Sequence, residues 1–228
     1  MNKHRLAVLG LAMIASGCGG GSQPSPTTQP TTTTVMKTMP LTAFRVVNGA
    51  LRAEAERVPE TRAIARASLL ALGLDTKVTI DAGTARVDLD DATAGQVAEI
   101  VYTLTQFPSV RRVDVAGRSG LTRADVTSFA PVILIEQPAA GAEVPETFTV
   151  SGTASVFEAT LVVELRRDGM MLSKHTVTAS EGAPARGTFT VTLRAPSPGG
   201  VTVAAYAPSA ADGTPQHEQD IPITVLKP

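Results

Sequence analysis

Apolar and polar residues alternate along the chain with two different periods, which divide it into two regions. From Leu41 to Gly120, stretches typical of strands alternate with stretches typical of helices. After a short hinge around 128–131, stretches with a period of two residues follow one another without a helical pattern. The pattern predicts two domains: a small α/β (α+β) domain at residues 41–120 and an all-β sandwich at residues 131–228.

The first region begins with a predicted hairpin. The segments TAFRVVN and LRAEAERV are rich in residues that favour strands, and Asn48-Gly49 between them is a pair that favours tight hairpin turns. A helix is predicted next, with Pro59 and Glu60 in its first turn and Gly73 at its carboxyl end. Two short strands, KVTID and ARVDLD, are expected to follow, joined by a tight turn.

The segment DATAGQVAEIVYTLTQFP predicts the clearest helix of the chain. Thr93 and Gln96 have the spacing of a capping box, and Pro108 ends the helical pattern. A last strand, VRRVDVAG, is expected after it, and the two helices are expected to cover one face of a single sheet. The apolar residues of the second helix recur at steps of three and four and form one stripe: Val97, Ile100, Val101, Leu104 and Phe107.

The segments of the first region resemble a known family. RVVNGALRAEAERVP, TARVDLDDA and QVAEIVYTLTQFPSVRRVDVAG are similar to the GerMN domain, named after spore-germination and sporulation proteins, and residues 102–115 are the most specific part. The connection between Leu72 and Lys77 is shorter than is usual in that family. GerMN domains resemble the ring-building modules of sporulation channels, so the resemblance implies self-association or docking to an envelope complex.

The second region predicts about seven short strands, which is typical of an immunoglobulin-like sandwich. Turns are indicated at Asp168-Gly169 and at Asp212-Gly213. The sequence lacks the Cys pair and the Trp of antibody domains, so the core is expected to be aliphatic. Alternate residues of four stretches are expected to share one face: Phe148, Val150, Gly152 and Ala154; Phe189, Val191 and Leu193; Val201, Val203 and Ala205; Ile221, Ile223 and Val225.

This region resembles a second family over residues 132–226. ILIEQPAAGAEVPETFTVSGTASVFEATLVVELRRDG, TVTASEGAPARGTFTVTL and SAADGTPQHEQDIPITV are similar to the immunoglobulin-like domain of bacterial spore germination. A GerMN domain followed by this domain behind a lipoprotein signal is a familiar arrangement. The family names imply a spore context, although these domains also look widespread in bacteria that do not sporulate.

Within SVFEATLVVEL, residues 155–165, Glu158 raises the question of a catalytic carboxylate. No His, Cys or second carboxylate is adjacent to it in the sequence to share its proton. The alternation of one continuous strand would place Glu158 on the solvent face, which is our expectation. The inward set would be Phe157, Ala159, Leu161, Val163 and Leu165, and the outward set Glu158, Thr160, Val162 and Glu164.

The N-terminus predicts a lipid anchor. MNKHRLAVLGLAMIASGC has a basic start, an apolar run too short to span a bilayer core of about 30 Å, and small residues before Cys18. It resembles a bacterial lipobox, with Ala15 where Leu is usual; an ordinary signal peptide is the alternative. We expect a signal peptide at 1–17, acylation of Cys18, extracytoplasmic attachment to the cell membrane, and a disordered Gly/Pro/Thr-rich tether at 18–40.

Charge limits the partners of the protein. The formal net charge is −1, and no basic stripe is present that could neutralise phosphates, so a nucleic-acid partner is not expected. Arg111 and Arg112, with Arg118 and Arg123, place positive charge at one end of the first domain. Arg111 and Arg112 are the candidate interaction surface: a solvated face is one interpretation, and contact with an anionic cell-wall polymer is the other.

Candidate chemistry is sparse, and no catalytic residue, metal or cofactor is predicted. Ser209, Asp212 and His217 could combine into a relay, but the sequence has no GxSxG-type elbow. In VDLDDAT, Asp91 or Thr93 is expected to cap the following helix and the other carboxylates to be solvated. A weak Ca²⁺ site formed by Asp88, Asp90 and Asp91 is the alternative.

The sequence therefore favours a non-catalytic, lipid-anchored cell-envelope protein that acts as an interaction or assembly module, with a link to sporulation or germination implied by the family names. Its expected partners are the membrane, envelope proteins or a second copy of the chain, and cell-wall polymer. A lipoprotein that binds cell-wall glycan or a small ligand is the alternative, for which Tyr206 is the obvious exposed aromatic residue. An envelope hydrolase is a weaker alternative.

Overall fold

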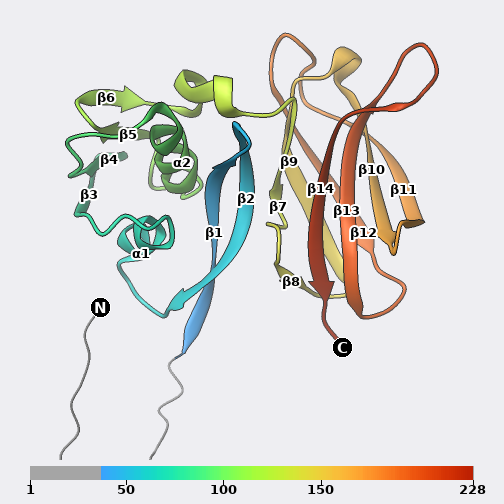
Figure 1. Ribbon diagram of the computed structural model, residues 1–228, viewed down its shortest axis with the longest axis horizontal. Coiled ribbons are helices and arrows are strands. Elements are labelled where there is room, and N and C mark those ends of the chain that lie inside the picture. The colour runs from blue at the N-terminus through green and yellow to red at the C-terminus, as the bar shows by residue number, and fades with distance from the viewer. Residues whose placement is uncertain (1–36, 228) are drawn as a thin grey trace, which may run out of the picture. The chain divides into compact units, whose positions relative to one another are not determined.

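The structure is a computed structural model that describes residues 37–227 (Figure 1). The expected signal peptide, Cys18 and most of the expected tether lie outside the described residues. The described part is mostly β with few helices, and none of its helices is long and apolar enough to cross a membrane.

Strands β1 (Thr38–Val47) and β2 (Ala50–Pro59) form a hairpin that is a sheet by itself. The two residues of its turn, Asn48 and Gly49, have positive φ angles of 52° and 82°, as the turn that matches the twist of paired strands requires. The predicted hairpin is therefore confirmed.

Helix α1 (Ile64–Ala71) is shorter than predicted. Pro59 belongs to the end of β2, and the backbone N–H of Glu60 donates to the carbonyl of Lys37 at 3.0 Å, so hairpin pairing holds these residues where a helix start was expected. The predicted end is confirmed, because Gly73 has a φ of 83° and the N–H of Leu74 reaches back to the carbonyl of Leu69 at 2.9 Å.

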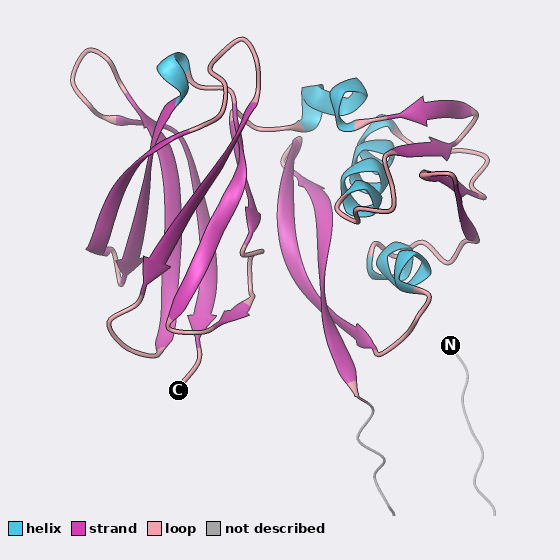
Figure 2. Ribbon diagram, turned by 180° about the vertical axis from the view of Figure 1, so that it is seen from behind, coloured by secondary structure: helices cyan, strands magenta, loops and turns pink. Residues whose placement is uncertain are grey.

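Helix α2 (Ala94–Thr105) begins with the predicted capping box. Thr93 Oγ1 accepts from the backbone N–H of Gln96 at 3.2 Å, and the side chain of Gln96 accepts from the N–H of Thr93 at 3.0 Å. The helix lies between the hairpin and a second sheet (Figures 1 and 2), in contact with β1 and β5. Its buried residues lie all around the helix: Val97, Ala98, Ile100, Val101, Tyr102, Thr103 and Leu104.

The strands of this half form two sheets, so the prediction of one sheet covered on one face was wrong. The second sheet has the order β3-β4-β5-β6, with β4 and β5 parallel. A helix that is buried all round needs a layer on each side, and the hairpin supplies the second one. The last strand was missed because RSGL has no apolar alternation. These strands are β3 (Val78–Asp81), β4 (Thr84–Val87), β5 (Arg112–Val115) and β6 (Arg118–Leu121).

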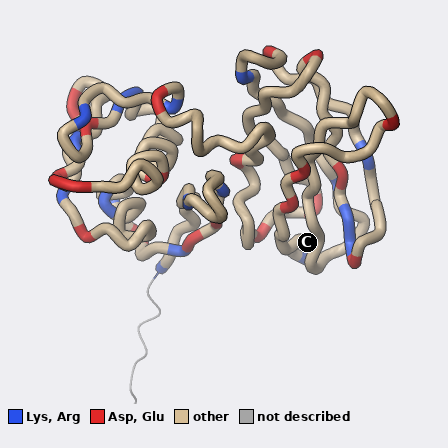
Figure 3. The backbone as a smooth tube through the Cα atoms, turned by 45° about the horizontal axis from the view of Figure 1, so that its top comes forward, with Lys and Arg blue, Asp and Glu red and all other residues tan. Residues whose placement is uncertain are grey.

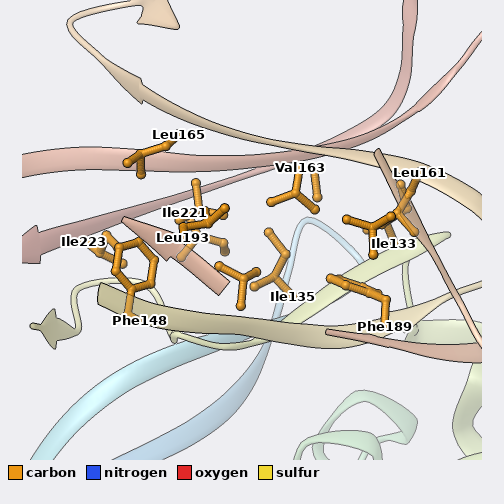
Figure 4. Close-up of a cluster of buried hydrophobic side chains, with 14 of the residues drawn as sticks. Ile133, Ile135, Phe148, Leu161, Val163, Leu165, Phe189, Leu193, Ile221 and Ile223 are labelled. Carbon is orange, nitrogen blue, oxygen red and sulfur yellow. The ribbon is translucent and has the colours of Figure 1, made fainter. Parts of the chain in front are cut away.

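The second half is a sandwich of two sheets, with the orders β11-β10-β13-β14-β8 and β12-β9-β7. An aliphatic core with two phenylalanines fills the space between them (Figure 4), as the alternation predicted. Its strands are β7 (Ile133–Gln137), β8 (Glu143–Val144), β9 (Thr147–Ala154), β10 (Thr160–Arg167), β11 (Met170–Thr178), β12 (Gly187–Arg194), β13 (Gly199–Pro208) and β14 (Pro215–Val225).

The two halves are joined by a 3-10 segment, η1 (Arg123–Phe129), and by direct contacts. Leu134 and Ala139 pack into the core of the first half, and the N–H of Ala55 donates to the carbonyl of Ala140 at 2.8 Å. The described residues accordingly belong to one compact unit. The division into domains at 41–120 and 131–228 stays a prediction.

The segment around Glu158 differs from the prediction. Residues Phe157–Ala159 form a 3-10 turn, η2, and β10 begins only at Thr160. Glu158 and Ala159 have φ angles of 52° and 54°, which break the alternation before the strand. Phe157 is therefore not in the core but 75% exposed, whereas Leu161, Val163 and Leu165 point inward as expected.

Candidate functional site

A groove of about 840 Å³, lined by polar and apolar residues, lies on the described part of the chain. One of its sides comes from the end of α2 and from η1, and the other from β7, β9 and β12. Because the groove lies where the two halves meet, its shape depends on the contacts that hold those halves together.

The floor of the groove is a double row of hydroxyls. Antiparallel pairing of β9 and β12 places Ser151 opposite Thr190 and Thr153 opposite Thr188. The neighbouring positions alternate into the core, where Phe189 is 2% exposed. Gly152 lets β7 pass close by, because a Cβ there would lie 2.0 Å from the carbonyl oxygen of Leu134.

Arg123 ties the wall of the groove together. Its Nη1 donates to both carboxylate oxygens of Glu136 at 2.8 Å, and its Nε donates to Thr105 Oγ1 at 3.0 Å. The guanidinium lies 4.7 Å from the ring centre of Tyr102, a cation–π distance. Burial raises the pKa of Tyr102, although the charge of Arg123 opposes this shift. The charges of Arg123 and Glu136 are already paired with each other, so the two side chains shape the site without offering a free charge.

A second arginine fixes the start of the sandwich below the groove. Arg186 Nη2 donates to the carbonyl of Pro131 at 2.6 Å, and its Nη1 donates to Thr153 Oγ1 at 3.2 Å. Burial lowers the pKa of Arg186. Because Pro131 lies two residues before the start of β7, this contact holds β7 near β9 and thereby holds the floor of the groove.

Two amides complete the lining. Gln106 Nε2 donates to the carbonyl of Thr42 at 2.8 Å, and Gln137 Nε2 donates to Thr42 Oγ1 at 3.1 Å. Both amides thus donate to the hairpin, and their oxygens and the floor hydroxyls are left to interact with a ligand. The groove can therefore bind an uncharged or weakly charged chain through hydrogen bonds.

The four arginines that were expected to place positive charge at one end of the first region differ in their surroundings. Arg111 lines the groove and lies over the β3–β4 turn, where its Nη2 donates to the carbonyl of Ala82 at 3.3 Å. Arg112 is exposed on β5 and is not part of the lining, and Arg118 borders a separate, partly acidic hollow. Arg123 is engaged in the wall. Charges of both signs are interspersed over the described chain (Figure 3).

Comparison with known families identifies part of the chain. Residues 132–214 match the family model of the immunoglobulin-like domain of bacterial spore germination. The second resemblance is thereby confirmed for this segment, while the GerMN resemblance stays a prediction.

Two solved structures are similar at low identity, and no curated protein matches the sequence. An engineered protein is 14% identical with a TM-score of 0.33, over 60% of this chain and 37% of its own. The matched region thus spans little more than a third of that protein. CopC from Methylosinus trichosporium OB3b is 17% identical with a TM-score of 0.29, over 41% of this chain and 92% of CopC.

The candidate catalytic and metal residues are not brought together into a relay or a metal site within 37–227. Asp212 Oδ1 accepts from Thr214 N at 3.1 Å and from Thr214 Oγ1 at 2.8 Å, and within 37–227 no hydrogen bond joins it to His217. Thr93 rather than Asp91 caps α2. Among the described residues, no three His, Cys, Asp or Glu side chains lie close enough to hold a metal ion.

Tyr206, which was expected to be an exposed aromatic residue, is buried. Tyr206 is 3% exposed, and its hydroxyl donates to Glu164 on the outer face of the five-stranded sheet. Phe157 is exposed instead, beside Glu158. Alternation could not reveal this exchange, because a positive φ at a residue other than glycine leaves no mark in a hydrophobic pattern.

Proposed function

We propose that the protein is a non-catalytic, lipid-anchored protein of the cell envelope that acts as an interaction or assembly module. The match of residues 132–214 to a spore-germination domain supports a germination-related role for that segment. The N-terminal sequence ending at Cys18 supports the anchor. The observation that carries the proposal is the groove between the two halves.

The groove has the chemistry of a binding surface. Its floor of hydroxyls and its amide oxygens form hydrogen bonds with an extended chain, while the Arg123–Glu136 pair is satisfied before any ligand arrives. The hydroxyl of Thr122, in the lining, donates to the carboxylate of Asp125 at 2.7 Å as part of the cap of η1. We infer that an envelope protein occupies the groove with a polar segment.

Crosslinking in cells tests this assignment. A photoreactive amino acid at Thr190, in the groove, is compared with one at Thr192, which is two residues further along β12 and is not part of the lining. We expect mass spectrometry to identify specific envelope proteins from the Thr190 variant and few from the Thr192 variant. Equal recovery from the two positions would contradict the groove as the interface.

A blocking variant gives an independent check. Thr190→Arg fills the groove with a long side chain, whereas Thr192→Arg adds the same charge to an exposed position of the same strand. Thr190→Arg is expected to reduce crosslinked partner at least fivefold, with unchanged thermal unfolding. If both variants keep the partner, the groove is not its binding site.

Binding of cell-wall polymer is the second candidate, because Arg111 lies at the groove beside the hydroxyls and amides. Under this function, the wild-type chain sediments with purified cell wall in a salt-sensitive manner, and Arg111→Glu abolishes that retention. Arg112→Glu, outside the lining, is the matched control. Retention that resists both substitutions would argue against the wall polymer as a ligand of this surface.

A further inference from the structure

We propose that the loop end of the sandwich holds a second binding site, which receives a Lys or Arg side chain from a basic segment of a partner protein. The site is a pocket of about 460 Å³. It lies where the β9–β10 loop meets the end of β13 and the beginning of β14. It shares no lining residue with the groove between the halves.

The backbone is strained at two residues of this pocket and at one residue beside it, none of them glycine. Glu158, Ala159 and His217 have φ angles of 52°, 54° and 56°. Such a conformation costs about 1 kcal/mol or more per residue and persists where the surrounding structure enforces it, often at binding sites. The strain alone identifies no ligand, but it fixes where the side chains of Glu158 and His217 begin.

The surrounding contacts enforce the conformation of the first loop. The carbonyl of Val156 accepts from the N–H of Ala159 at 3.2 Å and from the N–H of Ala183 at 2.9 Å. The loop that contains Gly182 packs so closely that a Cβ there would lie 2.8 Å from the backbone nitrogen of Ala159. The turn that carries Phe157 and Glu158 is therefore built into the fold.

His217 reaches the pocket through an irregularity in the ladder of β13 and β14. Ala207 is paired with Gln216, but Ala205 is paired with Gln219, so β14 has one extra residue between these pairs. A bulge of this kind turns a side chain away from the regular alternation of its strand. It places His217 beside the β9–β10 loop, on the rim of the pocket.

The lining combines an aromatic ring with an unneutralised carboxylate. Phe157 is 75% exposed at the rim, and Val156 is buried beneath it. No Lys or Arg belongs to the lining, and no ion pair engages Glu158 within the described residues. A ligand cation can therefore lie against the ring face while it pairs with the carboxylate.

The same lining disfavours other ligands. An anion would have to approach the carboxylate of Glu158 with only the imidazole of His217, and no Lys or Arg, in the lining to compensate for the repulsion. A neutral sugar would leave that carboxylate without a counter-charge. The pocket is also large enough for the end of one long side chain but not for a folded domain, so we assign it to a single basic anchor residue in an exposed segment.

Peptide binding to the full chain tests the proposal. The probes are hexa-arginine and hexa-lysine, with hexa-glutamate and chitohexaose as the anionic and neutral controls, and binding is measured by calorimetry and by backbone amide NMR shifts. We expect the two basic peptides to bind and to shift amides of residues 155–160 and 216–217, and the controls not to bind. No binding of the basic peptides at millimolar concentration, or preferential binding of chitohexaose, would overturn the assignment.

Two substitutions separate a specific pocket from general attraction of positive charge. Phe157→Ala and Glu158→Gln are each expected to weaken hexa-arginine binding at least fivefold. Their matched controls are Met170→Ala, another exposed apolar residue, and Glu60→Gln, another exposed carboxylate, both outside the lining. If Glu60→Gln weakens binding as much as Glu158→Gln, or if Phe157→Ala has no effect in a variant with unchanged thermal unfolding, the pocket is not the site.

Discussion

The hydroxyl of Tyr206 donates a 2.7 Å hydrogen bond to Oε1 of Glu164. Tyr206 is 3% exposed and Glu164 is 6% exposed. The residues lie on neighbouring strands, β13 and β10. Arg166 Nε donates to the other carboxylate oxygen at 2.8 Å. An acidic residue on the outer face of a sheet is thus buried and hydrogen-bonded within the protein.

Tyr206→Phe should destabilise the protein, because it removes one hydrogen bond to a buried carboxylate and leaves the ring in place. Hydrogen bonds to charged groups are each worth about 2 kcal/mol, and a decrease of this size in the free energy of unfolding is expected from urea denaturation. Thr192→Val, which removes an exposed hydroxyl on another strand, should change it by less than about 0.5 kcal/mol. Equal effects of the two substitutions would contradict the assigned role.

The stability of the protein should fall at acidic pH partly through Glu164. Burial raises the pKa of Glu164, but hydrogen bonds from Tyr206 and Arg166 outweigh it and hold the pKa below its usual value of 4.5. The stabilisation is therefore fully present above the pKa of the unfolded chain and is lost as the pH falls through the folded pKa.

Urea denaturation between pH 2 and pH 7 measures this contribution. Glu164→Gln cannot ionise, so its free energy of unfolding should be lower than that of the wild type at pH 7, and the difference should shrink below about pH 4. A difference that stays constant over the whole range would show that the charge of Glu164 is not the source of the stabilisation.

The Arg123–Glu136 pair should couple the two halves of the described chain. Arg123→Met removes a two-pronged ion pair and the cation–π contact with Tyr102, and Glu136→Gln removes the charge of the partner. Bonds of this kind are each worth about 2 kcal/mol. We expect a coupling energy of about 1 kcal/mol or more in a double-mutant cycle of urea denaturation. Additive effects would mean that the pair does not act as a unit.

Local signals in the sequence predicted most individual elements of the fold. The pair Asn48-Gly49 predicted its hairpin because the turn chemistry resides in two adjacent residues, and Thr93 with Gln96 predicted the start of α2 for the same reason. The arrangement of sheets on both sides of α2 was not predicted. An apolar stripe shows that a helix is covered, but it does not show how many layers cover it.

The candidate sites were harder to predict, because each depends on residues far apart in the chain. Arg111 could be singled out by its charge, but Ser151 and Thr190 become a groove floor only through the pairing of β9 with β12. Tyr206 was expected to be exposed and is buried, whereas Phe157 was expected in the core and is exposed. A buried hydrogen-bond partner and a left-handed turn decided that exchange, and neither has a local signature.

Cys18→Ser should release the protein from the membrane, if the N-terminal sequence is processed as its lipobox-like pattern predicts. Two or more acyl chains hold a protein on a bilayer, whereas a single chain is only marginal, so the variant should move from the membrane fraction to the soluble fraction. Fractionation of cells and labelling with a radioactive fatty acid measure both effects. Ser16→Thr, which keeps the cysteine, is the control, and a membrane-bound, unlabelled wild-type protein would contradict the anchor.

Glu158→Gly should separate stability from binding at the loop end of the sandwich. Glycine adopts a φ of 52° without steric strain, which favours the folded state, but it also increases the entropy of the unfolded chain. The free energy of unfolding of Glu158→Gly should therefore equal that of the wild type or exceed it by up to about 1 kcal/mol. Glu158→Ala, which keeps the strain, should not be more stable than the wild type.

Both variants lack the carboxylate and should lose the binding of basic peptides. Stability that is kept while binding is lost would show that the fold maintains the strained turn for its carboxylate, whereas a Glu158→Gly variant that still binds hexa-arginine would show that the carboxylate is not part of a site.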